Sequence, residues 1–270
     1  MTAVAGPDTG SRGEDEPGTA AGPGCRIGIV VPCFNEAHRL RPDAFSEFAR
    51  RGPVRFLFVN DGSTDDTRAV LGALSRDAPA QVAVLDLATN AGKGEAVRRG
   101  MLEVFGWGVA YAGFWDADLA TPLDAIPAFA AILDGEPRLE MVFGARVLLM
   151  GRSIRRSSTR HYAGRLFATA VSLVLGLPIY DTQCGAKLFR ATPAVQALFQ
   201  APFRSRWIFD VELVARLVRA RRGTRAPSPA EVIHEHPLEQ WHDVPGSKVR
   251  AVDFARAAVE LARIYRAYLR

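Results

Sequence analysis

The sequence lacks both a long hydrophobic run and a secretory signal. No stretch reaches the roughly 18 consecutive apolar residues that a membrane-spanning helix needs. The first 25 residues also lack the basic start and the apolar middle of a secretory signal. We therefore expect a cytoplasmic protein, with any contact to the inner face of the membrane being peripheral.

Cysteine is scarce as well. The three cysteines, Cys25, Cys33 and Cys184, are odd in number and widely spaced, so they match neither a disulfide framework nor a zinc site. We expect three reduced thiols.

Two familiar phosphate-binding loops are missing. Gly94, rather than Ser or Thr, follows Lys93, which excludes a Walker A loop. No G-x-G-x-x-G segment follows the first predicted strand, which argues against a dinucleotide-dependent oxidoreductase. The Gly92-Lys93-Gly94 segment can still act as a phosphate clamp, because glycines let backbone amides approach oxygen atoms while Lys93 adds a charge. A glycine-rich turn that only starts a helix is the alternative.

The composition is that of a globular chain with one substantial core. Hydrophobic residues make up 48% of the 270 residues and charged residues 23%. Residues 1–25 are rich in Gly, Pro and Thr without apolar periodicity, which predicts a disordered tail. The net charge of +5 favours anionic partners.

Short apolar runs alternate with helical patterns along the chain. Strands are predicted at residues 26–31, 54–59, 82–85, 111–115, 141–145 and 231–235, with a loop and strand over 181–189. Helices are predicted at residues 42–51, 66–77, 93–105, 162–175, 210–221 and 247–270. This alternation predicts an α/β fold with a mostly parallel sheet flanked by helices.

Polar residues follow three of the predicted strands. They are Asn35-Glu36, Asn60-Asp61 and the pair Asp116 and Asp118. In a parallel sheet the ligand lies beyond the carboxyl ends of the strands, so these residues are expected to converge on one crevice. Two carboxylates at i and i+2 suit a hard divalent cation such as Mg²⁺ or Mn²⁺. A solvated turn at the end of a strand is the alternative.

Seven sequence blocks resemble family 2 glycosyltransferases. They are VPCFNE at 31–36, VNDGSTDDT at 59–67, NAGKGEAV at 90–97, DADL at 116–119, DTQCGAKLF at 181–189, RWIFDVEL at 206–213 and VPGSK at 244–248. The last three blocks resemble the dolichyl-phosphate β-glucosyltransferase branch and other polyprenyl-phosphate glycosyltransferases. The resemblance covers roughly residues 26–255. It implies a Rossmann-like GT-A domain at 26–246, followed by a C-terminal amphipathic helix at 247–270.

The resemblance also implies roles for individual residues. Those implied at the nucleotide are Pro32, Asn35, Glu36, Asp61, Lys93, Asp116 and Asp118. Asp116 would lie on the ribose or metal side, and Asp118 would bind Mg²⁺ or Mn²⁺ together with the diphosphate. A carboxylate such as Asp61 can accept from a uracil imide, and one such as Glu36 can accept from ribose hydroxyls.

Family 2 enzymes invert the anomeric centre by in-line displacement, and the acceptor decides what else is needed. A hydroxyl acceptor requires a carboxylate base, for which Asp210 is the first candidate and Asp181 the second. A phosphate acceptor is already largely anionic at neutral pH and needs cations more than a base. The candidate cations are Arg146, Arg160, Lys187 and Lys248.

The preferred hypothesis is an inverting, metal-dependent transfer of a hexose, glucose from UDP-glucose, to a polyprenyl or dolichyl phosphate. Transfer to a soluble hydroxyl acceptor, a glycan or a natural product, is the rival within enzymes. A non-catalytic module that binds sugar nucleotides is the rival from another class. No nucleic-acid partner is expected, because the acidic pair would repel a polyanion.

The last predicted helix has a basic side. Arg256, Arg263 and Arg270 recur every seven residues, opposite Leu261 and Tyr265. Such a helix can lie on an anionic membrane surface. Docking against the catalytic domain with a solvated arginine face is the alternative.

Overall fold

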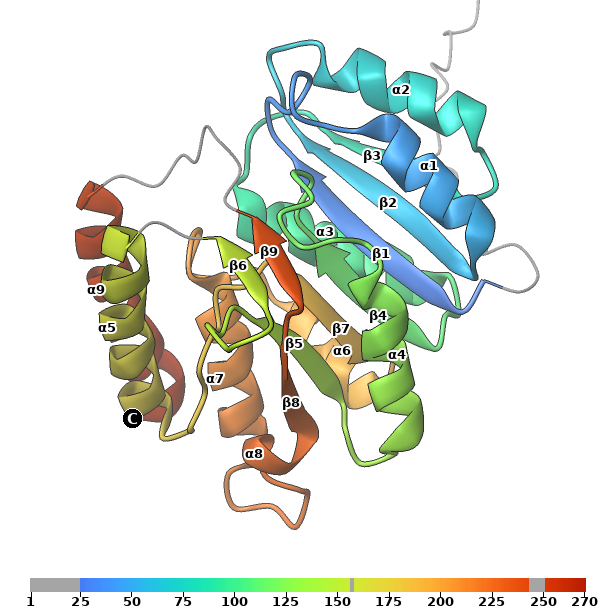
Figure 1. Cartoon of the computed structure of the whole chain (residues 1–270). Coiled ribbons are helices and arrows are strands. Elements are labelled where there is room, and N and C mark those ends of the chain that lie inside the picture. Colours follow the sequence, from blue (N-terminus) through green and yellow to red (C-terminus); the bar gives the residue numbers. More distant parts are fainter. Residues whose placement is uncertain (1–24, 156–157, 243–250) are drawn as a thin grey trace, which may run out of the picture.

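Seven strands in the described part of the chain form one sheet with helices on both faces (Figure 1). The computed structural model describes residues 25–155, 158–242 and 251–270, with the backbone alone at 155, 158–163 and 251–255. The strands are β1 Ile27–Cys33, β2 Val54–Asp61, β3 Val82–Leu87, β4 Tyr111–Trp115, β5 Met141–Ala145, β6 Ser153–Arg155, β7 Ala186–Arg190, β8 Ile233–Pro237 and β9 Gln240–His242. Strands β6 and β9 form a separate short pair.

The helices of the described part of the chain follow in chain order. They are α1 Pro42–Arg51, α2 Thr67–Asp77, α3 Lys93–Gly106, α4 Ala125–Gly135, α5 Ser158–Leu175, α6 Pro193–Gln200, α7 Phe209–Arg221, α8 Pro229–Val232, α9 Ala251–Ile264 and the π-helix η1 Tyr265–Leu269.

The strand order is β3-β2-β1-β4-β7-β5-β8. Only β7 runs against its neighbours β4 and β5, so the mostly parallel sheet is confirmed. The first residue of β7, Ala186, pairs with Trp115 at the carboxyl end of β4. The antiparallel direction therefore brings the turn before β7 to the sheet edge where the parallel strands end.

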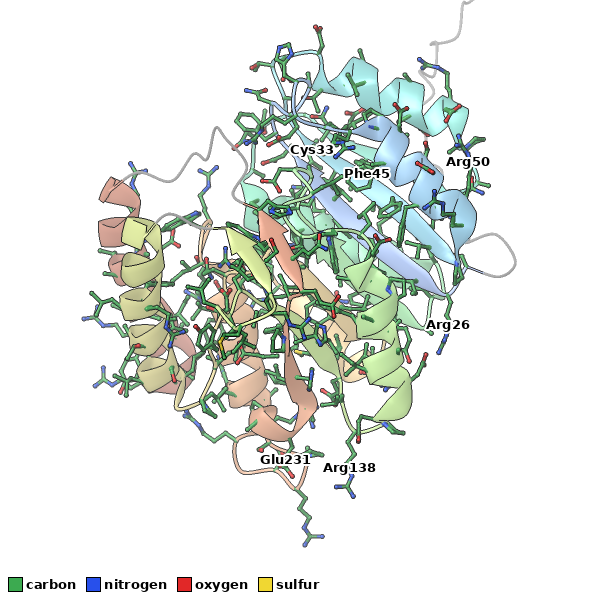
Figure 2. The ribbon with its side chains drawn as sticks, viewed as in Figure 1. Arg26, Cys33, Phe45, Arg50, Arg138 and Glu231 are labelled. Atoms are coloured by element: carbon green, nitrogen blue, oxygen red, sulfur yellow. The ribbon has the colours of Figure 1, made fainter. Side chains whose placement is uncertain are left out.

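Both faces of the sheet are buried, which explains why its strands are almost continuously apolar. Val30 and Phe114 pack against the layer that contains α3, α6 and α7. The alternate residues pack against the layer of α1, α2 and α4. Phe45 of α1 lies in this second layer, with its ring centroid 5.2 Å from Phe56 and 5.0 Å from Phe58 (Figure 2). The two helical layers thus hold the strands in place from both faces of the sheet.

The C-terminal helix docks on the domain with its apolar side. Ala257, Leu261 and Ile264 are buried in the layer that contains α7. Arg256 and Arg263 are exposed. The π-helix η1 that follows contacts both α7 and α5 (Figure 1). The described part of this helix therefore takes the docked arrangement with a solvated arginine face.

The predicted strands and helices up to β5 are present, with ends shifted by no more than a few residues. Helices α4, α6 and α8 and strands β6 and β9 were not predicted. Residues 1–24 of the predicted tail lie outside the described residues. Among the residues described, no helix is both long and apolar enough to cross a membrane.

Candidate functional site

The loops after β1 and β2 are tied together at the edge of the sheet. Asn35 has a φ of +54°, in the left-handed region that short Asn side chains tolerate. Its backbone N–H donates to Ser63 Oγ at 3.0 Å, and its Oδ1 accepts from the Thr64 N–H at 2.9 Å. The predicted convergence of these two strand-end loops is therefore present, and Asn35 joins them.

Glu36 is held close beside this junction. Its backbone N–H donates to Thr67 Oγ1 at 2.8 Å. Its carboxylate accepts from Arg39 Nε at 2.8 Å, and the side chain is buried. Pro32 lies in register with Val59 of β2 at the end of β1. Pro32 and Glu36, both predicted to contact the nucleotide, thus lie at the edge of the sheet where β1 and β2 end.

Asp61 organises the turn before α3. The side chain is 2% exposed. Its two carboxylate oxygens accept from the backbone N–H of Ala91 at 2.7 Å, from that of Gly92 at 2.9 Å and from Asn90 Nδ2 at 3.0 Å. The carboxylate therefore fixes the glycine turn that carries Lys93. If Asp61 also accepts from a nucleobase, its oxygens would make that hydrogen bond in addition to these three.

Lys93 points from the start of α3 toward the acidic pair. Its Nζ lies 2.5 Å from Asp116 Oδ1, and its side chain is 40% exposed. Partial removal from water alone would lower the pKa of Lys93, but the carboxylates of Asp116, Asp210 and Asp118 raise it above its usual value. Lys93 therefore stays a cation at the centre of the site.

The two aspartates sit on a tight turn after β4. Leu119, which closes the turn, has a φ of +54°, a strained conformation for this residue type. Ala120 N donates to Asp118 Oδ1 at 3.1 Å. Gly185, before β7, packs so closely that a Cβ atom there would lie 1.9 Å from Asp116 Oδ2. The turn before β7 therefore sets the position of the Asp116 carboxylate.

This acidic pair has the chemistry that a divalent cation needs. Burial raises the pKa of Asp118, and repulsion from Asp116 raises it further. A cation between the two would relieve that repulsion. In the described part of the chain, no group of three or more His, Cys, Asp or Glu side chains is arranged to hold a metal. The protein would thus supply two carboxylates, and a phosphorylated ligand the other oxygens, as is common for Mg²⁺.

Asp210 is paired with a lysine inside the protein. Lys187 Nζ lies 2.6 Å from Asp210 Oδ1, and the Lys187 side chain is 0% exposed. Its ammonium lies 5.1 Å from the Phe114 ring centroid and 5.0 Å from that of Phe143. Burial raises the pKa of Asp210, while Lys187 and Lys93 oppose this shift. Lys187, expected at an acceptor phosphate, is therefore an internal partner of Asp210.

Asp181 and Arg146, predicted for different roles, bind each other. Arg146 Nε and Nη2 donate to the two Asp181 oxygens at 2.7 and 2.8 Å. Burial would raise the pKa of Asp181, but Arg146 holds it below its usual value. The Arg146 guanidinium also lies 5.4 Å from the Trp241 ring centroid. A carboxylate so paired is a weak base, which leaves Asp210 the stronger candidate.

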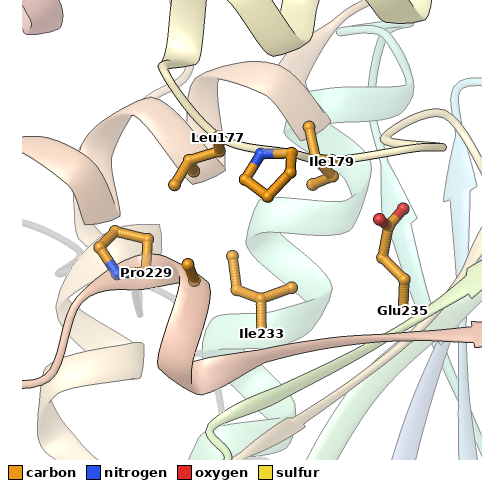
Figure 3. A pocket seen from close by; sticks show the side chains of 7 residues that line it. Leu177, Ile179, Pro229, Ile233 and Glu235 are labelled. Carbon is orange, nitrogen blue, oxygen red and sulfur yellow. The ribbon is translucent and has the colours of Figure 1, made fainter.

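Glu235 supports this pair from β8. Its carboxylate accepts from the backbone N–H of Tyr180 and of Asp181, both at 2.7 Å. It also lies at one end of a small, mostly apolar cleft of about 100 Å³ (Figure 3). The lining residues are Leu177, Pro178, Ile179, Pro229, Ala230, Ile233 and Glu235. The cleft contains none of the predicted site residues.

Two of the four predicted acceptor cations lie outside the side chains that the structure describes. Lys248 lies outside the described residues, and the side chain of Arg160 is not described. Their expected contact with an acceptor phosphate stays a prediction.

Three residues of the site were not predicted from the sequence. They are Gly185, Glu235 and Arg206, which is exposed and whose Nη2 lies 3.4 Å from Asn90 Oδ1. Gly185 lies in the block at 181–189 and Arg206 in the block at 206–213, so the resemblance of these blocks to the family could have indicated both residues. Glu235 carries no comparable signal, because its partners are backbone amides that only the fold brings near.

Comparisons with known proteins agree with this geometry. A sequence model of glycosyl transferase family 2 matches residues 28–195. The dolichyl-phosphate β-glucosyltransferase of Saccharomyces cerevisiae is 31% identical over 264 residues, covering 90% of this chain and 75% of that protein. The enzyme of the same name from Drosophila melanogaster is 36% identical, covering 84% and 70%.

Solved structures share the GT-A fold. Glucosyl-3-phosphoglycerate synthase from Mycobacterium tuberculosis, in complex with Mg²⁺ and UDP, superposes with a TM-score of 0.64 at 19% identity, covering 90% of this chain and 80% of that one. A mannosyltransferase from Pyrobaculum calidifontis, in complex with GDP-mannose and Mn²⁺, gives a TM-score of 0.57 at 17% identity, covering 89% and 64%. The predicted fold class is confirmed.

Proposed function

The chain belongs to glycosyl transferase family 2, and on that premise we propose that it transfers glucose from UDP-glucose to a polyprenyl phosphate, with inversion at the anomeric carbon. The observation that carries this proposal is the Lys93, Asp116 and Asp118 cluster at the end of the sheet, in a chain similar to dolichyl-phosphate β-glucosyltransferases.

The donor site is proposed on the rim formed by the strand-end loops. Pro32, Asn35, Glu36 and Asp61 would contact the nucleoside. Asp116 and Asp118 would hold Mg²⁺ or Mn²⁺, which when bound neutralises charge on the diphosphate. Lys93 would bind the departing diphosphate, because its ammonium lies beside the acidic pair.

The acceptor side requires cations if the acceptor is a phosphate. The proposed residues are Arg146, Arg160 and Lys248. Lys187 is left out of this set, because its side chain is fully buried against Asp210. Arg146 already neutralises the buried Asp181, so in the described state its charge is shared with that partner. With a hydroxyl acceptor, Asp210 is the proposed base. Burial disfavours the ionised carboxylate and raises its pKa, so the carboxylate accepts a proton more readily than it would in water.

We also propose a peripheral membrane contact, because a polyprenyl phosphate is a membrane lipid. Leu166 and Leu173 lie two turns apart on α5 and are 76% and 79% exposed. Met150, after β5, is fully exposed as well. Exposed arginines of α9, Arg256 and Arg263, would complement an anionic lipid surface.

The proposed activity predicts that lipid phosphate stimulates the use of UDP-glucose. Purified protein with Mn²⁺ and UDP-glucose should release UDP faster when vesicles that carry polyprenyl phosphate are added, and a glucosylated lipid should form. The measurements are a coupled assay for UDP and chromatography of the lipid. Vesicles carrying unphosphorylated polyprenol are the matched control. Sedimentation of the vesicles also measures the membrane contact, because bound protein leaves the supernatant.

Two results would change the proposal. If a soluble glycan or alcohol stimulates UDP release and the lipid phosphate does not, the acceptor assignment is wrong while the family stands. If neither acceptor has an effect and the protein only binds the sugar nucleotide, it acts as a binding module.

Gly185→Ala should damage the donor site without unfolding the protein. The new methyl group would collide with the Asp116 carboxylate, which is partly exposed and can rotate away from Lys93. Losing one charge-assisted contact should raise the KM for UDP-glucose by about tenfold. Steady-state kinetics with varied donor test this expectation.

Gly135→Ala is the matched control, because nothing lies within 4 Å of a Cβ atom at that position. Its KM should equal that of the unmodified chain. A Gly185→Ala protein with an unchanged KM would contradict the role given to the turn before β7.

A further inference from the structure

One short loop links the C-terminal helix to the proposed donor site. It comprises residues 204–208, between α6 and α7. A Cβ atom on Gly92 would lie 3.1 Å from Arg206 Nε, so the guanidinium packs against the glycine turn itself. Arg206 Nη2 lies 3.4 Å from Asn90 Oδ1, and the side chain is exposed. A second cation thus stands next to Lys93 at the start of α3.

Glu212 of α7 holds the first half of this loop. The side chain is 0% exposed, and its Oε2 accepts from the backbone N–H of Arg204 and of Ser205, both at 2.8 Å. Its Oε1 accepts from Arg216 Nη2 and from the Tyr268 hydroxyl of η1, each at 2.8 Å. The C-terminal segment therefore already touches the anchor of the loop.

Glu260 of α9 holds the second half. Its Oε2 accepts from the backbone N–H of Trp207 at 3.4 Å and of Ile208 at 3.3 Å. It also accepts from the hydroxyl of Ser205, whose Oγ accepts from the Ile208 N–H at 2.8 Å. Carboxylates therefore bind the backbone on both sides of Arg206, and one of them comes from the C-terminal helix.

We propose that Glu260 is a positioning residue for the donor: it fixes residues 204–208 so that the Arg206 guanidinium binds the diphosphate of the nucleotide. The inference rests on the proposed function, which supplies that diphosphate. A guanidinium suits a phosphate because its planar fork donates two parallel hydrogen bonds. Fixing the loop in advance lowers the ordering cost of binding. The C-terminal helix thereby becomes part of the donor site without touching the donor.

Calorimetric titration of UDP in the presence of Mn²⁺ tests this inference. Arg206→Ala should weaken UDP binding by about tenfold, the effect of one charge-assisted contact. Glu260→Ala should also weaken it. The double variant should bind UDP no more weakly than Arg206→Ala alone, because Glu260 acts through Arg206. Val259→Ala, at a position of the same helix that is 52% exposed, is the control and should bind UDP as the unmodified chain does.

The outcomes separate this inference from the proposed function. UDP binding by Glu260→Ala equal to that of the unmodified chain, or losses that add in full in the double variant, would overturn the role of Glu260. If Glu260→Ala does not fold, Glu260→Met takes its place, because the thioether keeps the length of the side chain but offers no strong acceptor to the loop. Unchanged UDP binding by Glu260→Met overturns the proposal in that case. An unmodified chain that does not bind UDP at all would instead overturn the proposed donor.

Discussion

Asp118→Ala is expected to abolish the release of UDP from UDP-glucose. Asp118 supplies one of the two carboxylates proposed to hold the divalent cation, and Asp116 alone would keep it only weakly. A metal ion stabilises transition-state charge by several kcal/mol, so we expect a rate loss of at least about a thousandfold. Initial rates of UDP release at saturating Mn²⁺ and acceptor give the measurement.

The same change should leave the fold intact. Because burial and Asp116 raise the pKa of Asp118, its ionised form is less favourable in the folded protein than in the unfolded chain. Removing that carboxylate should therefore leave Tm unchanged or raise it. A loss of activity at an unchanged Tm would assign Asp118 to the chemistry.

Asp124→Ala is the matched control for this prediction. Asp124 precedes α4, is exposed and makes no capping hydrogen bond with its side chain. Its removal should leave UDP release at the level of the unmodified chain. Substantial UDP release by Asp118→Ala, or an unmodified chain that keeps its full rate in EDTA, would contradict the metal site.

The parallel half of the fold could be predicted because its signals are local. Strands β4 and β5 lie at the predicted residues, since short apolar runs that end at polar residues define buried strands. The convergence of Asn35 on the loop after β2 follows from parallel strand direction alone. The missed helix α6 also had a local signal, since Thr192 caps it and Pro193 follows at its first position.

The antiparallel direction of β7 could not be predicted. Strand direction depends on pairing between distant segments, and neither the apolar pattern nor the turn at Gly185 specifies it. That direction places Gly185 against Asp116 and turns Lys187 toward α7. The sequence therefore singled out Arg146, Lys187, Asp181 and Asp210 but not their pairing, because opposite charges on separate elements meet only in the folded chain.

Asp210→Asn is the second change with a large expected effect, and it acts in two ways. It leaves the ammonium of Lys187 buried without a charged partner. Breaking one side of a buried ion pair costs about 3–5 kcal/mol, so Tm should fall clearly. It also removes a carboxylate that raises the pKa of Lys93 at the proposed donor site. We expect the rate of glucose transfer to fall by about a hundredfold, a typical effect for a group at the reacting centre.

A double variant separates these two effects. Lys187→Met with Asp210→Asn replaces the buried cation by an apolar side chain of similar length, between the rings of Phe114 and Phe143. Exchanging a buried ion pair for apolar packing is often neutral or stabilising, so most of the lost Tm should return. The transfer rate should not return with it, because Lys93 still lacks Asp210. If the rate recovers together with Tm, Asp210 serves only to neutralise Lys187. That result would exclude both a role of Asp210 as the base and a role in positioning Lys93. Thermal denaturation and initial rates at saturating UDP-glucose, measured on the same preparations, decide between the two.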